Sequence, residues 1–582
     1  MATNHSLVAL FRELAQLATL DEGSANSFRV RAYENAVEAI ASHPGDLGQL
    51  SERELTKIDG IGSSTARKIR EFFQNGSIGK LEELRRKFPP EFVALGRIPG
   101  IAPKTLHRHR DELGVTNLDT LAAALAGRKL RSLPGLGVKT EEKILQSIGR
   151  LRAAGFEPGA EQPRVPIAKA MPIVRELTAA LAAVPAVEDV QYCGALRRLD
   201  ETTGTVDIVA ATLEPLAAHA AFASQQAVAK VLDRDAVTTS VETATGLRVD
   251  LHTVDPERFG VACLLRTGSP DHVGKLRSRA AERGFTLDES GLLDADGEVI
   301  ASVSEDAIYE ALGLAPIAPP LREDRGEIEH AEKGALPPPI LLPQVRGDLH
   351  VHTTLSGDGR STLEEILDAA AARGYEYLAI TDHAEDLAIN GATREQLTAQ
   401  RRQIDGLRGR HPGLTLLHGS ELNIDRDGDV DYDEAFRHTL DWCVASVHSH
   451  FDLDRSQQTR RILRAMDDPT VHVIGHLSGR RIGTRMGIEL DVDQVLQKAV
   501  ATGTAIEINA ALPRLDASSE VLYRARGMDV TFVISTDTHH TREFARMEWG
   551  VLHATRGWVD PDRVANLWPR ARFLDWLHSR RA

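Results

Sequence analysis

Histidine and carboxylate side chains recur at the ends of short β-like runs in the last third of this 582-residue chain. The run GDLHVHTTLSGDGR places His350 and His352 two residues apart, and STDTHH gives Asp537 and His539 the same spacing. A spacing of two puts both side chains on one face of a strand. The other side chains of this kind near β-like runs are Asp358, His383, Glu421, His448 and His476. These residues are candidate metal ligands.

Mixed ligation by imidazoles and carboxylates suits zinc, manganese or iron, and nine ligands suffice for two or three ions. Such ions lower the pKa of bound water from about 15.7 to about 7, which supplies hydroxide at neutral pH. The alternative is a chance scatter, since 14 of the 22 histidines lie in residues 346–582 and some must be bystanders. We expect surface positions for His411, His438, His553 and His578, and leave His450 and His540 open.

The elements that must position these residues alternate along residues 346–582. β-like runs such as YLAITDH, CVASVHSH and TAIEINA are separated by helical stretches. This alternation predicts an α/β domain, and in an α/β barrel the C-terminal ends of the strands converge at one mouth. The candidate ligands lie at that end of their runs, so a barrel would gather them into one site.

The order H-x-H, D, H, E, H, H and D-x-H resembles that of the PHP (polymerase and histidinol phosphatase) domain, with every family position filled. The resemblance covers residues 346–582, including GHLSGRRIG and the STD-x-H ending. It implies a distorted TIM-like barrel that holds up to three metal ions, with Glu421 as a bridging ligand, and that cleaves phosphoesters. The family's activity on DNA is 3′–5′ exonucleolytic and often favoured by manganese. Relatives hydrolyse phosphomonoesters, which leaves phosphatase activity open.

A short motif occurs three times in the front of the chain, as IDGIGSSTARKI, IPGIAPKTLHRH and LPGLGVKTEEKI. Each copy is a tight glycine turn that opens a helix, where exposed N–H groups favour an anion. The repeat resembles the helix-hairpin-helix motif, which grips the DNA backbone without reading sequence. The alternative is a turn that merely connects helices, and Ala102 replaces a glycine in the second copy. The candidate DNA-contacting residues are Gly60, Gly62, Gly100, Lys104, Gly135, Gly137 and Lys139.

The charge distribution agrees with DNA binding at the front. Residues 1–150 carry a net charge of +4, the remainder carries −19, and the whole chain carries −15. A mildly basic front joined to an acidic rear fits nucleic-acid binding at one end and a metal site at the other. We expect contacts mainly with the phosphates of gapped or single-stranded DNA, so affinity should fall steeply as salt rises.

The middle of the chain resembles the nucleotidyltransferase palm of family X DNA polymerases. That family shows G-S-x-R-R followed by E-T-x-G-D-[IV]-D, and residues 194–212 read GALRRLDETTGTVDIVAAT. Residues 266–292 match the family's thumb. The residues that the resemblance assigns are Gly194, Arg197 and Arg198 for nucleotide binding, and Asp207 and Asp250 for catalysis.

Two departures fall within this signature. Thr205 stands where the first aspartate of the D-x-D pair belongs, and Ala195 stands where a phosphate-binding serine belongs. Two-metal phosphoryl transfer needs clustered anionic oxygens to hold magnesium or manganese, and threonine carries no charge. A loss of roughly 3–5 kcal/mol of transition-state stabilisation slows a reaction about 10²–10⁴-fold. We therefore expect weak or absent polymerase activity. Two other functions stay open: an active gap-filling polymerase with PHP proofreading, and a non-catalytic DNA-binding scaffold.

Lys68 is a candidate for the processing of abasic sites. It lies eight residues after Gly60 and matches the Schiff-base lysine in the lyase domain of related polymerases. Such a lysine must be partly deprotonated, and the adjacent Arg67 would depress its pKa. The alternative is a lysine that faces solvent or contacts phosphate.

The whole chain is similar to a bacterial-type family X DNA polymerase with a C-terminal PHP domain. We expect a helical DNA-binding region in 1–155, an α+β palm and thumb in 160–315, a Pro-rich extended linker in 316–345 and the PHP barrel in 346–582. No run of about 18 apolar residues occurs, so we expect no membrane span, and we read no export signal. Three well-separated cysteines suggest a reducing compartment. We therefore expect a cytoplasmic, nucleoid-associated monomer in DNA base excision repair, with dNTP as a ligand if the palm still binds one.

Overall fold

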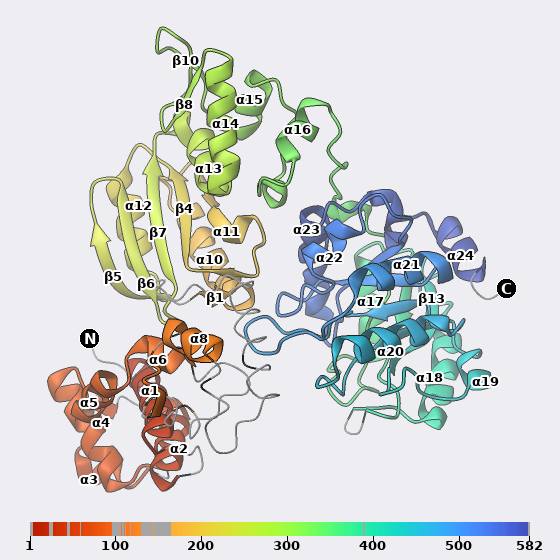
Figure 1. Ribbon diagram of the computed structural model, residues 1–582, viewed down its shortest axis with the longest axis horizontal. Helices are drawn as coiled ribbons and strands as arrows, with labels where there is room; N and C mark the ends of the chain where they lie inside the picture. Colours follow the sequence, from red (N-terminus) through yellow and green to blue (C-terminus); the bar gives the residue numbers. More distant parts are fainter. Residues whose placement is uncertain are drawn as a thin grey trace. The chain divides into compact units, whose positions relative to one another are not determined.

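The computed structural model describes residues 4–22, 27–42, 47–58, 60–95, 106, 110, 112–116, 118–127, 129, 144, 164–387 and 390–579. The chain divides into two compact units, residues 1–163 and residues 164–582. Figure 1 traces each unit in sequence order. Among the described helices, none has both the length and the apolar character that crossing a bilayer requires.

The first unit is built from short helices around one apolar core. Its described helices are α1 (Asn4–Glu22), α2 (Phe28–Ser42), α3 (Glu52–Leu55), α4 (Ser63–Asn75), α5 (Gly79–Lys87), α6 (Pro90–Leu95) and α8 (Leu118–Ala126). Leu7, Phe11 and Leu14 recur at helical spacing, so they face the same side of α1 and are fully buried. Phe11 meets Tyr33 of α2 edge to face, with ring centroids 6.1 Å apart.

The second unit begins with the region that resembles a palm, which is called the palm below and is built on a five-stranded sheet in the order β2-β4-β7-β6-β5. Its strands are β2 (Asp189–Tyr192), β4 (Thr205–Ala211), β5 (Val228–Arg234), β6 (Thr238–Thr243) and β7 (Arg248–Val254), and the short elements are β1 (Val165–Pro166), α11 (Gly194–Arg197) and β3 (Thr202–Thr203). Helices α10 (Ile167–Ala182) and α12 (Pro215–Ala223) share a core with Ile208 and Val249 of the sheet. Strand alternation therefore leaves Asp207 and Asp250 on the other face, where the parallel register of β4 and β7 pairs them.

A thumb region follows the palm. It consists of α13 (Phe259–Thr267), α14 (Pro270–Glu282), β8 (Thr286–Asp288), β9 (Gly291–Leu293), β10 (Val299–Ala301) and α15 (Glu305–Ala311). Ser269 caps α14 by accepting a 3.1 Å hydrogen bond from His272 N, and Pro270 occupies the first turn. Leu264, Leu276 and Ile308 form the centre of a separate core.

The Pro-rich connector is folded over part of its length. Helix α16 (Glu327–Glu332) buries Ile328 and Ala331 in the same core as the thumb helices. Burial of apolar side chains between the proline clusters favours this packing. Residues 327–332 therefore differ from the extended linker that the proline content predicts.

The rear of the unit is a seven-stranded parallel sheet with its strands in sequence order. The strands are β11 (Gly347–Asp348), β12 (Tyr377–Ile380), β13 (Thr415–Asn423), β14 (Trp442–Ser446), β15 (Val473–Gly475), β16 (Ala505–Asn509) and β17 (Phe532–Ser535). The helices are α17 (Leu363–Ala372), α18 (Arg394–Leu407), α19 (Glu434–Arg437), α20 (Arg455–Asp467), α21 (Val492–Thr502), α22 (Ser519–Arg524), α23 (Met547–Arg556) and α24 (Arg570–Ser579). A parallel bridge between Val351 and Thr538 joins the two edges, so the sheet is a nearly closed barrel. The expected TIM-like α/β fold is confirmed.

One end of the barrel is filled by aromatic side chains. Tyr377, at the start of β12, stacks on Phe573 of α24 with ring centroids 4.2 Å apart. Trp442, at the start of β14, packs in the same buried cluster. The strand starts are therefore sealed by apolar packing, and polar side chains gather at the strand ends.

Candidate metal centre

The barrel strands deliver the candidate ligands to one place, because parallel strands all end on the same side. His350 and His352 follow β11, Glu421 lies in β13, and Asp537 and His539 follow β17. The remaining members follow their own strands: Asp358 in the loop after β11, His383 after β12, His448 after β14 and His476 after β15. The strand-end positions expected from the sequence are thus the positions in the structure.

The ligands form three groups, and within each group the ligating atoms lie within 4.8 Å of one another. The groups are His350, His352 and Asp537; His352, His383 and His539; and His383, Glu421 and His448. Because His352 and His383 each belong to two groups, neighbouring groups share a ligand. Such sharing is the arrangement that a cluster of ions needs.

Glu421 lies at the centre of the cluster. Its Oε1 is 2.9 Å from His476 Nε2 and 3.3 Å from His448 Nε2, and its Oε2 is 3.4 Å from His350 Nε2. Asp358 reaches the cluster from its loop, with Oδ1 3.5 Å from His539 Nε2. The structure therefore brings all nine predicted side chains together.

Unpaired polar atoms show that the cluster suits cations. Nε2 of His350, Nε2 of His352 and both carboxylate oxygens of Glu421 are buried, and none of these atoms makes a well-aligned hydrogen bond among the described residues, although imidazole nitrogens lie as close as 2.8 Å to Glu421. Each unsatisfied buried polar group costs about 1–3 kcal/mol, so a set of them at one point favours bound metal ions. The mixed imidazole and carboxylate donors fit zinc, manganese or iron.

The protonation states of two members of the cluster, His352 and Glu421, fit metal ligation. Burial, with the nearby His539 and His383, lowers the pKa of His352 to about 3, so this imidazole is neutral. Burial alone would raise the pKa of Glu421, but the surrounding imidazoles, His448 first, hold it well below its ordinary value. A neutral imidazole beside an ionised carboxylate is the form in which both groups bind metal.

A second layer of side chains orients the ligand rings. Glu507 Oε1 lies 2.6 Å from His350 Nδ1, and Asn423 Oδ1 lies 2.7 Å from His448 Nδ1. With Nδ1 engaged in this way, Nε2 of each ring is directed at the cluster. Neither partner was expected from the sequence, although Glu507 lies in the run EINA within β16.

Arg514, which was not expected from the sequence either, places a cation beside the cluster. Its side chain is 11% exposed, and its Nε lies 3.3 Å from Asp537 Oδ2. Nη1 of Arg514 is buried without a hydrogen-bond partner in the described part of the chain. A guanidinium with a free N–H next to a metal site can hold a phosphate oxygen.

The palm offers fewer anionic oxygens, and cationic or imidazole groups already face them. Asp250 accepts from Arg248 Nε at 2.9 Å, and Asp207 lies 2.8 Å from His252 Nε2. Arg266 Nη1 lies 3.8 Å from the same oxygen of Asp207. Thr205, opposite Arg248 in the β4–β7 register, supplies no carboxylate.

Of the residues assigned to nucleotide binding, Gly194 lies beside Asp207, and both arginines are engaged in ion pairs with other residues. Gly194 has φ +71°, and a Cβ there would lie 3.7 Å from Asp207 Oδ2. Arg197 makes a bidentate pair with Glu305 at 2.9 and 2.8 Å. Arg198 donates to Glu323 at 2.6 Å and to Asp200 at 2.9 Å. The charges of Arg197 and Arg198 are thus compensated within the chain.

Two of the predicted DNA-contact glycines are described. Gly60 has φ +86°, and a Cβ there would lie 3.0 Å from Asn35 O, so the turn requires glycine. Gly62 begins α4 as its N-cap. The other predicted contacts, Gly100, Lys104, Gly135, Gly137 and Lys139, lie outside the described residues.

Lys68 lies on α4 and is half-buried. Its Nζ donates to Ser64 Oγ at 2.9 Å and lies 5.6 Å from the centre of the Tyr33 ring. Burial lowers the pKa of Lys68, against the raising effect of Glu71, and Arg29 and Arg67 lower it further. The direction agrees with the depressed pKa expected from the sequence.

One histidine expected at the surface is buried. His553 of α23 is 1% exposed, and its Nε2 lies 2.8 Å from Ala517 O. The loop that follows β16 covers this face of α23, which local sequence could not show. His438 and His578 are exposed as expected, and His411 is partly buried and pairs with Asp368.

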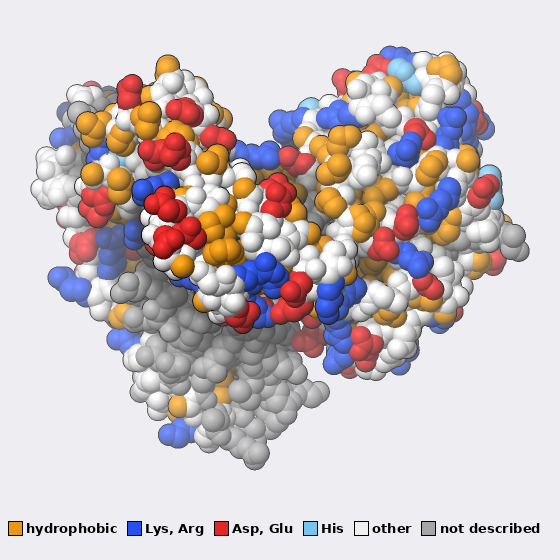
Figure 2. Space-filling model, turned by 90° about the horizontal axis from the view of Figure 1, so that it is seen from above, with side chains coloured by type: hydrophobic (Ala, Val, Ile, Leu, Met, Phe, Trp, Pro, Cys, Tyr) orange, Lys and Arg blue, Asp and Glu red, His pale blue; other side chains and the backbone are white. Residues whose placement is uncertain are grey.

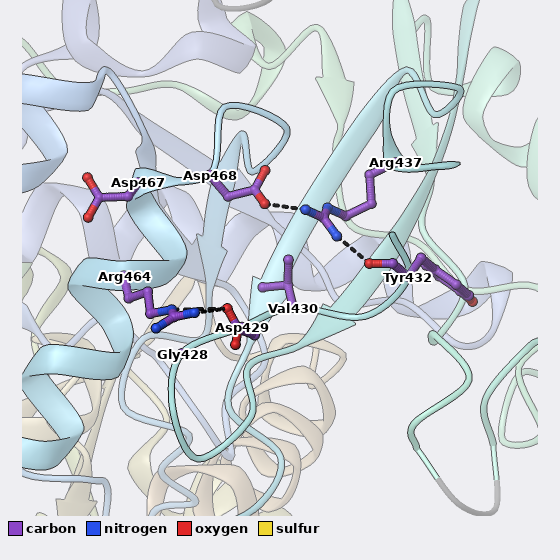
Figure 3. A pocket seen from close by; sticks show the side chains of 8 residues that line it. All are labelled: Gly428, Asp429, Val430, Tyr432, Arg437, Arg464, Asp467 and Asp468. Carbon is purple, nitrogen blue, oxygen red and sulfur yellow. Dashed lines mark hydrogen bonds and ion pairs between the residues drawn. The ribbon is translucent and has the colours of Figure 1, made fainter. Parts of the chain in front are cut away.

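A cavity of about 440 Å³ lies between the loop after β13 and α20 (Figure 3). Its two guanidinium groups are already paired: Arg464 Nε lies 3.0 Å from Asp429, and Arg437 donates to Asp468 and Tyr432 O. None of the nine clustered residues lines it. This cavity is therefore separate from the candidate metal centre.

Comparison with protein families gives four matches. A helix-hairpin-helix domain matches residues 2–78, and a SAM-like helix-hairpin-helix tandem matches 52–113 and 92–150. The DNA polymerase beta thumb matches residues 262–323. The PHP domain matches residues 348–511.

Comparison with curated proteins gives relatives of two kinds. The DNA polymerase/3′-5′ exonuclease PolX of Bacillus subtilis is 34% identical over 548 residues, which are 93% of this chain and 94% of the relative. A probable phosphatase of Syntrophotalea carbinolica is 33% identical over 28% of this chain and 64% of its own length. A probable phosphatase of Vibrio cholerae is 26% identical over 40% of this chain and 93% of its own length.

Proposed function

Because the chain belongs to the PolX family of DNA polymerases/3′–5′ exonucleases, we propose that its main activity is metal-dependent 3′–5′ hydrolysis of DNA at the PHP barrel. One contrast carries this proposal. The barrel gathers nine potential ligands with unpaired buried atoms, whereas the palm has two carboxylates that already face Arg248, His252 and Arg266.

The nine side chains would hold two or three divalent ions, which when bound supply a hydroxide nucleophile and stabilise the leaving oxygen. Glu421 contributes its charge among the imidazoles of His350, His448 and His476, and Glu507 fixes the ring of His350 by accepting from Nδ1. Arg514 would hold the phosphodiester, because its buried guanidinium lies beside Asp537 and retains a free N–H.

We propose that polymerase activity is weak or lost. Thr205 removes an anionic oxygen from the palm, and the two remaining carboxylates are partnered by side chains of the same unit. A palm of this kind would hold magnesium or manganese poorly. Its retained shape would serve to position DNA together with the helix-hairpin-helix region.

Incubation with manganese and two end-labelled substrates tests the proposal. The substrates are a 3′-recessed duplex with all four dNTPs and a single strand. Shortening supports the exonuclease, lengthening supports an active gap-filling polymerase, and no change supports a non-catalytic scaffold. His350→Ala is the control, because it removes a ligand and should abolish shortening only.

A second candidate activity is phosphomonoester hydrolysis. Two relatives are named probable phosphatases. The same cluster would attack a terminal phosphate with the same hydroxide chemistry. Release of inorganic phosphate from a 3′-phosphorylated oligonucleotide, compared with release of nucleotides, separates the two activities.

Lys68 is proposed as the nucleophile of an abasic-site lyase. Its lowered pKa and partial burial support the proposal, since a Schiff base requires a neutral amine. Borohydride trapping on a 5′-deoxyribose phosphate substrate tests it. An adduct that persists in Lys68→Met would reject this assignment.

The proposed partner is gapped or single-stranded DNA. We also propose a role in DNA base excision repair. The proposed location is the cytoplasm, at the nucleoid, and the proposed oligomeric state is a monomer. Basic and acidic side chains are interspersed on the face shown in Figure 2. We propose that binding relies on local phosphate contacts at helix-opening glycine turns such as Gly60 and Gly62. Affinity measured against salt concentration tests this, and a slope near zero would contradict it.

A further inference from the structure

Arg480, in the loop after β15, joins the palm to the metal-centre end of the barrel. Its Nη1 donates to Glu201 Oε1 of the palm at 2.6 Å. Its Nε donates to Arg514 O at 2.9 Å, and its Nη2 donates to Leu515 O. The Arg480 side chain is 14% exposed and that of Glu201 is 42% exposed, so one largely buried guanidinium connects a partly exposed palm carboxylate with the backbone of residues 514–515.

The segment around Arg514 is held from the barrel side as well. Asp516 is fully buried and accepts from Ser478 N at 3.0 Å and from Ser478 Oγ at 2.9 Å. His553 Nε2 lies 2.8 Å from Ala517 O. These contacts fix where the segment runs after β16.

The palm side contributes packing in addition to the ion pair. Leu515 is fully buried and belongs to the same apolar core as the palm residues Ile167 and Leu196. At Gly483 a Cβ would lie 2.5 Å from Pro166, so the loop that carries Arg480 lies directly against β1. The palm therefore forms one wall of this part of the barrel.

These contacts form a path from the palm to the candidate metal centre. Glu201 binds Arg480, Arg480 binds the backbone of Arg514, and the Arg514 side chain lies 3.3 Å from Asp537. Glu201 belongs to the palm signature. In a polymerase, residues near Glu201 in this signature would bind the nucleotide and catalyse its transfer. In this chain its carboxylate is directed at the barrel.

We propose that Glu201 and Arg480 are positioning residues for the phosphodiesterase, so that the palm completes the exonuclease site by setting the position of Arg514. This inference rests on the proposed function. Under this inference, a palm that lacks one carboxylate still has a role in hydrolysis, because it holds the backbone of residues 514–515 in place and thereby positions the Arg514 side chain. A misplacement of about 1 Å can slow a reaction about 10²-fold, so a smaller shift of Arg514 should lower kcat by less than this.

A second palm–barrel ion pair provides a matched control. Arg175 of α10 makes a bidentate pair with Glu548 of α23 at 2.8 and 2.9 Å. The described contacts of the Arg175 side chain do not include residues 514–516. Loss of this pair should loosen the same interface without moving Arg514.

The experiment compares the full-length wild type with Glu201→Ala, Glu201→Gln and Arg175→Met in manganese-dependent hydrolysis of an end-labelled single strand. We expect kcat of Glu201→Ala to fall about tenfold with little change in KM. Glu201→Gln, which keeps an acceptor oxygen, should recover part of the loss, and Arg175→Met should resemble the wild type. Metal content and Tm should stay at wild-type values in Glu201→Ala, and hydrogen exchange at residues 511–517 should become faster.

A double-mutant cycle with Arg480→Met tests the path itself. If Glu201 acts through Arg480, Glu201→Ala should cause no further loss in the Arg480→Met background. Equal losses in Glu201→Ala and Arg175→Met, or wild-type kcat in Glu201→Ala, would overturn the inference while leaving the exonuclease intact. A wild-type chain that does not shorten DNA would overturn the proposed function and this inference with it. If Arg480→Met fails to fold, the three single variants alone decide.

Discussion

Oε1 of Glu507 lies 2.6 Å from Nδ1 of His350, and both side chains are fully buried. The carboxylate fixes the ring so that Nε2 is directed at the cluster. Glu507→Gln should therefore lower metal affinity about 10–100-fold, because outer-shell partners of metal-binding histidines have effects of this size. Metal retention after dialysis against a graded chelator measures it. Unchanged retention would show that the ring is oriented by packing alone.

Removal of a ligand should separate hydrolysis from DNA binding. His350→Ala or Asp537→Ala takes away a member of the group of ligating atoms that lie within 4.8 Å. We expect loss of DNA degradation with little change in DNA affinity, since the helix-hairpin-helix region lies in the other unit. Nuclease assays and fluorescence anisotropy on the same preparations check this. Loss of binding in either variant would contradict the division of labour between the units.

Arg514 should contribute to the chemical step. Its guanidinium lies 3.3 Å from Asp537 and keeps a free N–H. Removal of one preorganised hydrogen-bond donor to a developing negative charge lowers kcat about 10²–10³-fold. We therefore expect kcat of Arg514→Met to fall by a factor of this size. Arg514→Lys keeps the charge without the fork and should lose less. Steady-state kinetics with an intact metal content decide; a change in KM alone would assign Arg514 to substrate affinity instead.

Restoration of the missing palm carboxylate should increase DNA synthesis. Thr205→Asp adds an anionic oxygen on the strand that carries Asp207 and gives the palm a better cage for metal ions. We expect manganese-dependent primer extension to rise at least about tenfold. Asp207→Ala in the same background is the control and should abolish the gain. Robust extension by the native chain that Asp207→Ala removes would show that the palm is active without the change.

His553 should make the fold sensitive to acid. Burial, with the nearby charge of Arg480, lowers its pKa from 6.5 to about 3. The unfolded chain binds this proton below about pH 6.5 and the folded chain does not, so the free energy of unfolding should fall as pH drops from about 6.5 toward 3 and stay unaffected above. Between about pH 6.5 and 5 the loss should be about 2 kcal/mol. Denaturant titrations measure it, and His553→Gln should flatten this part of the profile. Equal slopes in both proteins would assign the acid sensitivity to other groups, such as the metal ligands.

The ligand set was predictable because its signal is local. His350 and His352 are two residues apart at a strand end, and the same holds for Asp537 and His539, so residue type and spacing identified them. Glu507 was missed for the opposite reason. A glutamate in a short apolar strand carries no sign of its partner, and His350 lies 157 residues away.

The errors have the same origin. His553 has a polar side chain on a helix, which predicts exposure, but residues 515–517 in the loop after β16 cover it. The Pro-rich connector reads as extended, but Ile328 and Ala331 find apolar neighbours in the thumb core. In both cases contacts between distant segments decided burial.

The sequence by itself determined the kind of chemistry: imidazoles and carboxylates at strand ends, glycine turns that open helices, and a palm signature in which threonine replaces an aspartate. Periodicity and residue type are properties of neighbouring residues, so they survive without a fold. Only the tertiary structure decided that Glu201 of the palm meets Arg480 of the barrel, 279 residues later. That contact depends on which surfaces pack together, and packing follows from the shape of the whole unit and cannot be read from any one segment.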